Sequence, residues 1–476
     1  MHTTPSSIHR DDRVVLISCY EMGQEPLGLA VPAGVLGRAG ERADVHAGVH
    51  ARLMDLSVQN LDEAIIANAL FVGISVPMHT ALRLGVAAAR RVRAINPAAH
   101  ICFYGLYAEL NADALADVAN SCLGAEFEMP LVALVRNVLD GRYEGAQPRR
   151  SRGGRSPNRS VSLLPDRSGL VDTERYARLA YEQELHRVGY TQSTRGCKHL
   201  CRHCPLPPVY DGAFYAIPPA DVLADIGSLI SRGARHITFA DPDFLNGPTH
   251  ARRIAHGIRE RFPGITFDYT AKIEHLQHHA DLVEELQDCG NLFVVSAVES
   301  LNDDVLTRLA KGHTRSDVFA VFRHFARIRL ALRPTFVPFT PWETLESYVD
   351  LLITMETEGL VEYVDPVQYS IRLLVPPGSL LIDSGEIKPF IGTLDTERFT
   401  WNWTHPDPDM DALQEEVARI AAAGATESEA PERTFRRLRD LACERADRPV
   451  PTGSPQILRG HAGTGPPPRL TEAWFC

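Results

Sequence analysis

Short apolar runs alternate with amphipathic segments through most of this 476-residue chain, and this alternation constrains the fold more than any other feature. Four apolar runs in the first part of the chain are typical of buried strands: 13–19, 43–49, 69–76 and 100–108. The segment 79–97 has the periodicity of an amphipathic helix and stops at a proline. Because strands that alternate with helices form parallel sheets, we expect a doubly wound parallel sheet over 13–140.

A second series of the same kind begins near residue 190. Its six expected strands lie within 190–197, 234–245, 265–276, 292–300, 331–339 and 364–379. Repeated βα units of this length predict a partial (β/α)6 TIM-type barrel, which we place at 166–385. The expected fold class is therefore α/β, with an N-terminal Rossmann-like sheet followed by the partial barrel. In βα barrels the chemistry gathers at the C-terminal ends of the strands, and we expect the same here.

Three further segments complete the predicted domain organisation. Residues 141–165 are rich in Arg, Gly and Ser, which is typical of a linker or a surface loop. Residues 386–450 are expected to form a helical extension. Residues 451–476 are rich in Pro and Gly and are expected to form a flexible tail.

Charge and hydropathy exclude several classes of protein. The net charge is −11, which argues against a nucleic acid as the main partner. No stretch approaches the roughly 18 apolar residues of a membrane span, and the N-terminus lacks the apolar core of a signal peptide. We therefore expect a cytoplasmic protein that acts on a small molecule.

Three of the nine cysteines, Cys197, Cys201 and Cys204, lie close together in one predicted loop. In a cytosolic chain such a cluster indicates a metal site. Three thiolates can bind three irons of a cubane and leave the fourth iron open to chelate a small molecule. Gly196 would let the backbone turn tightly before the first ligand. Zinc is the alternative, with His199 or His203 as a fourth ligand, although zinc sites more often use paired knuckles from two loops.

The Cys-x3-Cys-x2-Cys motif after a first barrel strand resembles the signature of the radical S-adenosylmethionine (SAM) superfamily. The resemblance covers roughly 185–385 and implies a [4Fe–4S] cluster that cleaves SAM, with an external electron donor such as flavodoxin or ferredoxin. His203 departs from the pattern, because the family usually has an aromatic residue there. We include it among the residues expected at the cofactor.

The strand-end segments resemble the branch that contains methylthiotransferases and cobalamin-dependent members. In Ile-Thr-Phe-Ala-Asp-Pro-Asp-Phe, the resemblance implies that Asp241 or Asp243 holds the amino end of SAM. In Val-Val-Ser-Ala-Val-Glu-Ser, it implies that Glu299 contacts the ribose or methionine part. Lys272 and Arg333 are candidates to pair with the SAM carboxylate. For each of these residues, a surface salt bridge or a strand-end cap is the alternative.

The N-terminal domain resembles the cobalamin-binding domain that precedes the barrel in many such enzymes. The residues that carry this resemblance are Glu25-Pro26-Leu27-Gly28-Leu29-Ala30 and Val72-Gly73-Ile74-Ser75. The Asp-x-His-x-x-Gly signature of a cobalt-ligating histidine is absent, and Tyr104-Gly105-Leu106 replaces a typical Gly-Gly pair. The sequence therefore leaves open whether the domain binds cobalamin or serves as a scaffold or lid.

The chain ends in Trp474-Phe475-Cys476. This ending resembles radical SAM proteins named for a Cys-Sec-Ala-Glu-Pro or Cys-Cys-Ala-Glu-Pro tail, in which a selenocysteine codon would come next. The resemblance implies that Cys476 is a catalytic thiol and that the chain belongs to a selenoprotein. A plain disordered terminus is the alternative.

Two functions from different classes follow. The first is a radical SAM enzyme that forms a 5′-deoxyadenosyl radical, with methyl or alkyl transfer if cobalamin binds. The second is a zinc- or cluster-bearing binding protein without turnover. The sequence does not indicate the substrate.

Overall fold

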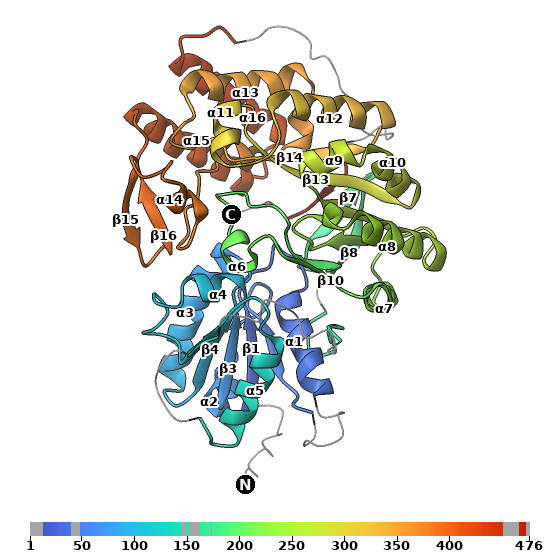
Figure 1. Cartoon of the computed structure of the whole chain (residues 1–476), viewed down its shortest axis with the longest axis vertical. Coiled ribbons are helices and arrows are strands. Elements are labelled where there is room, and N and C mark those ends of the chain that lie inside the picture. The colour runs from blue at the N-terminus through green and yellow to red at the C-terminus, as the bar shows by residue number, and fades with distance from the viewer. Residues whose placement is uncertain are drawn as a thin grey trace. The chain divides into compact units, whose positions relative to one another are not determined.

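The computed structural model describes residues 13–39, 48–143, 149–151, 162–172, 174–450 and 466–472 (Figure 1). The chain divides into two units. The first contains Met1–Tyr176 together with Thr396–Phe399, and the second contains Ala177–Asp395 and Thr400–Cys476. Among the described residues, no helix has the length and hydropathy needed to cross a membrane.

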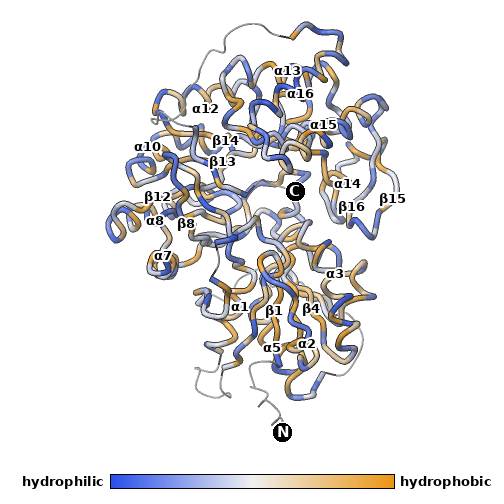
Figure 2. Tube along the Cα trace, turned by 180° about the vertical axis from the view of Figure 1, so that it is seen from behind, coloured by the Kyte–Doolittle hydropathy of each residue, from blue (hydrophilic) through white to orange (hydrophobic). Residues whose placement is uncertain are grey.

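The first unit is built on a parallel sheet with the strand order β2-β1-β3-β4-β5-β6. Its strands are β1 (Val14–Ser18), β2 (Arg52–Asp55), β3 (Phe71–Ser75), β4 (His100–Tyr104), β5 (Ser121–Leu123) and β6 (Arg149–Ser151). Every residue of β1, β3 and β4 is buried, as expected for strands covered on both faces. Figure 2 shows the hydrophobic residues along β1 and β4. The predicted N-terminal parallel sheet is confirmed.

Helices connect these strands. They are α1 (Leu27–Arg38), α2 (Glu63–Asn68), α3 (His79–Ile95), α4 (Leu106–Leu110) and α5 (Glu128–Leu139). Helix α1 packs against α5, and α2 packs against α3. The predicted strand at 100–108 is wrong in its second half: β4 ends at Tyr104, and Gly105 turns the chain into α4 with φ +109°. The predicted strand at 43–49 falls mostly outside the described residues, and β2 follows it at Arg52–Asp55.

The second unit contains a curled, seven-stranded half-barrel with the order β14-β13-β12-β11-β8-β7-β17. Five of its strands run parallel: β8 (Glu184–Thr191), β11 (His236–Phe239), β12 (Thr266–Thr270), β13 (Asn291–Glu299) and β14 (Ala331–Phe336). Two antiparallel strands, β7 (Arg178–Tyr181) and β17 (Arg469–Leu470), continue the sheet beyond β8. The predicted partial barrel is confirmed.

The half-barrel carries its main helices between the parallel strands (Figure 1). They are α7 (Pro219–Ser231), α8 (Pro248–Arg261), α9 (Ile273–His278), α10 (Ala280–Asp288), α11 (Asp303–Arg308) and α12 (Arg315–Ile328). Helix α13 (Leu345–Thr357) follows β14.

The predicted sixth barrel strand is reduced to a single parallel bridge between Phe339 and Arg372. Before this bridge, the chain forms a short 3-10 helix, η4 (Pro366–Ser370). Pro366 has no N–H to give to a sheet and its φ is fixed, which favours the helical turn. Tyr369 then packs on Phe435, with ring centroids 5.3 Å apart.

The C-terminal part of the second unit is mainly helical. Helices α15 (Pro408–Thr426) and α16 (Pro431–Arg445) pack on each other and on η4. A hairpin of β15 (Ile391–Asp395) and β16 (Thr400–Trp403) precedes them, and α14 (Leu380–Ser384) precedes the hairpin. These elements extend the half-barrel beyond its last parallel strand.

Candidate active site

The three clustered cysteines follow the first parallel strand of the half-barrel. After β8, a short strand β9 (Thr194–Gly196) pairs antiparallel with β10 (Phe214–Ala216). Gly196, the last residue of β9, has φ +75°, and a Cβ there would lie 2.4 Å from the carbonyl oxygen of Ala213. Only glycine fits this turn, because a side chain would meet backbone. The glycine therefore sets the direction of the chain into Cys197.

Backbone hydrogen bonds hold the cysteine loop against distant segments. The N–H of Arg202 donates to the carbonyl of Leu309 at 2.9 Å. The carbonyl of Arg202 accepts from the hydroxyl of Ser379 at 3.0 Å and from the N–H of Leu381 at 3.2 Å. Loops beyond β13 and β14 thus fix the loop that carries Cys201 and Cys204.

The three thiols suit a soft metal group. Cys201 is buried, whereas Cys197 and Cys204 are partly exposed. Burial and, to a smaller extent, the charges of the Cys201 and Cys197 thiols raise the pKa of Cys204 to about 12. A positive metal group between them would reverse this effect. Three thiolates on one loop fit a [4Fe–4S] cluster with one open iron.

Glu299 occupies a strained position at the end of β13. Its φ is +71°, and the register with β14 shifts between Ala297 and Glu299. Such strain costs about 1–3 kcal/mol in a non-glycine residue and clusters at functional sites. Its Oε1 lies 3.0 Å from Nζ of Lys311 and 3.2 Å from Nε2 of His203.

The charge of Glu299 is set by its two partners. Burial alone would raise the pKa of Glu299, but the Lys311 ammonium and the hydrogen bonds from His203 and Lys311 hold it well below its usual range. Both partners contact Oε1, and the described residues give no hydrogen bond to Oε2. Glu299 is therefore an anionic group with one oxygen open to an outside donor.

The two predicted aspartates lie after β11 and have different surroundings. Asp241 accepts from the N–H and the hydroxyl of Ser193, at 2.8 and 2.7 Å, and from the hydroxyl of Thr194. It therefore orders the chain between β8 and β9, and burial raises its pKa to about 6. Asp243 caps the 3-10 helix η2 (Phe244–Asn246) through the N–H of Leu245 and accepts from His275 Nδ1 at 2.8 Å.

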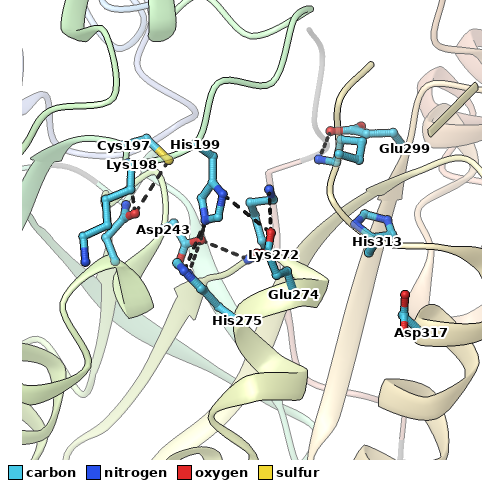
Figure 3. Close-up of polar contacts among 12 residues, drawn as sticks. Cys197, Lys198, His199, Asp243, Lys272, Glu274, His275, Glu299, His313 and Asp317 are labelled. Atoms are coloured by element: carbon cyan, nitrogen blue, oxygen red, sulfur yellow. Dashed lines mark hydrogen bonds and ion pairs between the residues drawn. The ribbon is translucent and has the colours of Figure 1, made fainter. Parts of the chain in front are cut away.

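The two predicted cations, Lys272 and Arg333, also have different surroundings. Nζ of Lys272, at the end of β12, lies 3.4 Å from Glu274 within the group shown in Figure 3. Arg333 on β14 pairs with Asp365 at 3.0 Å and donates to the carbonyl of Pro468. Arg333 would have to leave this ion pair to bind the carboxylate of a ligand, whereas Lys272 lies beside the cysteine loop's His199.

Three residues that the sequence did not single out belong to the same site. Lys311 follows α11 and pairs with Glu299. Asn246 accepts from the N–H of Lys198 at 3.2 Å and lies 3.8 Å from Sγ of Cys197. His275 on α9 faces His199, with their Nε2 atoms 3.2 Å apart (Figure 3). Lys311 lies three residues after α11 and His275 lies in the first turn of α9. A polar side chain at such a position usually faces solvent, so the local sequence does not mark Lys311 or His275.

In the first unit, several side chains pack near the end of β1, at the edge expected to hold cobalamin. The carboxylate of Glu21 accepts from the N–H groups of Leu27 and Gly28, at 3.0 and 3.1 Å, at the start of α1. A Cβ on Gly28 would lie 2.1 Å from the hydroxyl of Ser75. Tyr104 is fully buried, packs 4.6 Å from the Phe127 ring and donates to the carbonyl of Gly28.

Two histidines of the first unit, His79 and His100, have hydrogen-bond partners. His79 Nε2 lies 2.6 Å from the carbonyl of Arg398, and His100 Nε2 lies 2.9 Å from the hydroxyl of Ser121. Burial raises the pKa of the Cys19 thiol to about 12. Of the three described histidines of this unit, His50 alone is exposed, and it precedes β2 rather than following β1. A cavity lined by Cys19, Leu56 and Leu61 lies at the ends of β1 and β2. The described residues after β1 therefore offer cobalt no histidine ligand. Cys476 lies outside the described residues, and its role stays a prediction.

Comparisons with known proteins agree with the cysteine site. Residues 191–352 match the family model of the Radical SAM superfamily. A tRNA-2-methylthio-N(6)-dimethylallyladenosine synthase of Haemophilus influenzae is 24% identical over 208 residues, which is 41% of this chain and 42% of that protein. The corresponding enzyme of Shewanella baltica is 23% identical over 200 residues, with 40% and 42% covered. The match thus spans less than half of these relatives.

Two solved structures share the fold over a longer stretch. The cobalamin-dependent S-adenosylmethionine radical enzyme OxsB, with aqua-cobalamin and S-adenosylmethionine bound, gives a TM-score of 0.64 at 14% identity, over 91% of this chain and 71% of that one. The radical S-adenosylmethionine methyltransferase TsrM from Kitasatospora setae, with cobalamin and a [4Fe–4S] cluster bound, gives 0.53 at 17% identity, with 72% of each chain covered. At these identities the likeness shows a shared fold.

Proposed function

We propose that this radical SAM enzyme holds a [4Fe–4S] cluster at Cys197, Cys201 and Cys204 and uses it to act on a small-molecule substrate. When bound, the cluster supplies one electron to SAM, which then separates into methionine and a 5′-deoxyadenosyl radical. The electron would come from an external donor such as a flavodoxin or a ferredoxin. The observation that carries this proposal is the loop of three thiols at the mouth of a half-barrel, beside the anchored carboxylate of Glu299.

The residues around the loop would bind SAM by complementary charge. The free Oε2 of Glu299 would accept hydrogen bonds from hydroxyl groups of the ribose, since a charged acceptor strengthens such bonds. Lys272 would face the carboxylate end of the methionine part, whereas Asp243 is engaged by His275 and by the N–H of Leu245. Asp241 would act indirectly, because it holds Ser193 and Thr194 next to the cysteine loop.

Anaerobic reconstitution with iron and sulfide tests the proposal. We expect four irons and four sulfides per chain, and 5′-deoxyadenosine on addition of SAM and a strong reductant. A protein that binds one zinc through the three cysteines and releases no 5′-deoxyadenosine would contradict it, and would favour a binding protein without turnover. Variants Cys197→Ala, Cys201→Ala and Cys204→Ala should each lose the brown chromophore, since three thiolates leave no spare ligand.

Cobalamin-assisted methyl or alkyl transfer would extend this function. The likeness to OxsB and TsrM supports it, because those proteins are cobalamin-dependent or hold cobalamin. The residues of the first unit give no histidine ligand after β1, and Tyr104, Phe127 and Glu21 pack at the strand edge. We therefore derive no step through cobalamin, and corrin analysis of anaerobically purified protein decides between transfer and a scaffold role.

The selenocysteine tail is a separate proposal that rests on the resemblance alone. Sequencing the gene past codon 476 tests it. A UGA codon followed by Ala-Glu-Pro codons would support it, whereas UAA or UAG directly after the codon for Cys476 would end it.

A further inference from the structure

Beside the cysteine loop, two histidines and an aspartate converge from three segments that are distant in sequence. His199 comes from the cysteine loop, Asp243 from the turn between β11 and η2, and His275 from α9 (Figure 3). One ligand atom from each residue lies within 4.8 Å of the others. The cubane assigned to the three thiols uses none of these atoms.

The distances suit ligands of one metal ion. Nε2 of His199 lies 3.2 Å from Nε2 of His275 and 4.0 Å from Oδ2 of Asp243. Two nitrogen or oxygen ligands at about 2.1 Å from one ion lie roughly 3.0–4.2 Å apart, depending on the angle. The array therefore needs only small side-chain movements to close on an ion.

The surroundings also suit a cation. Oδ2 of Asp243 lies 2.8 Å from Nδ1 of His275, and Oε2 of Glu274 lies 3.6 Å from Nδ1 of His199. Carboxylates on the far ring nitrogen commonly orient metal-binding histidines, and Glu274 is placed to do so for His199, whereas Asp243 is itself one of the three ligands. The same group contains one ammonium, that of Lys272, which is already paired with Glu274. Two carboxylates thus oppose a single positive charge.

We propose that His199, His275 and Asp243 bind one divalent transition-metal ion, separate from the cluster held by the cysteines. Two imidazoles and a carboxylate suit ions such as zinc or iron(II). Three protein ligands leave at least one position for water or for a polar group of the substrate. The site would place a Lewis acid beside the cysteine loop, and its occupancy does not depend on SAM cleavage.

Zinc binding to the cluster-loaded protein tests the proposal. The reconstituted enzyme is incubated with zinc chloride, desalted anaerobically and analysed for iron and zinc. We expect about one zinc in addition to four irons in the wild type, and loss of the zinc alone in His275→Gln. His278→Gln, at an exposed histidine of the same helix, is the matched control and should keep both metals.

Two results would overturn the proposal. Equal zinc in wild type and His275→Gln would show that the ion lies elsewhere, and zinc that disappears on cluster assembly would place it on the thiols. Zinc-edge X-ray absorption of the wild type gives a readout that does not depend on the folding of a variant. Nitrogen and oxygen scatterers at about 2.0–2.1 Å would support the site, and a sulfur shell near 2.3 Å would refute it.

Discussion

Nζ of Lys311 lies 3.0 Å from Oε1 of Glu299, and both side chains are almost completely buried. Removing two charges from water is expensive, and only their mutual attraction and additional hydrogen bonds compensate for it. Burial lowers the pKa of Lys311, but the charge of Glu299, and to a smaller extent the nearby Cys201 and Cys204 thiols, raise it above its usual value. One cation thus serves the carboxylate and the cysteine loop together.

Glu299→Gln should leave the cluster intact and weaken SAM binding. The amide is neutral, so a ribose hydroxyl loses a charge-assisted hydrogen bond worth about 1.5–3 kcal/mol, or roughly 10- to 150-fold in affinity. Isothermal titration of SAM into the cluster-loaded protein measures this change. Glu260→Gln, at an exposed carboxylate of α8, is the control. An unchanged dissociation constant in Glu299→Gln would assign the residue a structural role only.

Lys311→Met should destabilise the second unit by about 3–5 kcal/mol, because it leaves Glu299 charged and buried without its main partner. The double variant Lys311→Met, Glu299→Gln should recover part of this loss, since no unpaired charge remains. Denaturant unfolding of the two single variants and the double variant measures the coupling. Strictly additive losses would show that the two residues act independently.

Gly196→Ala should lower the iron content of the reconstituted protein. The methyl group would meet the carbonyl of Ala213, so the chain could not turn toward Cys197 as it does now. Gly264→Ala is the matched control, because Gly264 also has a positive φ, +87°, but no atom lies within 4 Å of its added Cβ. Iron analysis should therefore separate the two variants. Full iron in both would show that the turn adapts to a side chain.

Stability of the first unit should depend on the protonation of Glu21. Burial raises the pKa of Glu21 from 4.5 to about 7, although hydrogen bonds from Gly28 and Leu27 oppose the shift. The folded state then binds the proton more tightly than the unfolded chain, so this stabilisation is complete below about pH 4.5 and is lost as the pH rises through about 7.

Melting temperatures at pH 5 and pH 8 test this dependence. The wild type should lose more stability between these pH values than Glu21→Gln, which stays neutral throughout. Glu63→Gln, at an exposed carboxylate of α2, should behave as the wild type. The same pH dependence in all three proteins would show that Glu21 is already ionised at pH 5.

Cobalamin added to the protein should bind, if at all, without a protein histidine on cobalt. The nearest candidates are His46, His50 and His79, and none lies in the loop after β1. His79 has a partner in the first unit, and His46 lies outside the described residues. Electron paramagnetic resonance of the cob(II)alamin form reports the axial ligand directly. Nitrogen splitting from a protein imidazole would contradict this prediction.

The sequence was informative where a feature is local. The spacing of Cys197, Cys201 and Cys204 lies within one loop, and Gly196 precedes it directly, so both could be recognised without a fold. Most of the parallel strands were also predictable, because strands covered on both faces form continuous apolar runs. The first barrel strand, expected within 190–197, is instead β8 at Glu184–Thr191, whose first residues are exposed and so form no apolar run. The run at 364–379 was wrongly predicted to be a strand. Tyr369 in this run packs on Phe435 of a helix, and burial against a helix favours apolar residues as burial in a sheet does.

Features that depend on tertiary contacts could not be predicted in this way. Lys311 contacts Glu299 only because the chain folds back toward the end of β13 after α11. His275 on α9 contacts His199 on the cysteine loop, although the two residues are far apart in sequence. The environments of Asp241 and Asp243 separate only when Ser193 and His275 are placed beside them. Identical residue types two positions apart in sequence therefore have different surroundings.

Strand β17 has a practical consequence for handling the protein. It pairs antiparallel with β7 at the end of the second unit's sheet, and Thr471 exchanges two hydrogen bonds with the backbone of Arg178, at 2.8 and 2.9 Å. Without it, β7 would expose unpaired N–H and C=O groups, which invite edge-to-edge association between copies. Truncations for crystallisation should therefore keep the chain through Thr471.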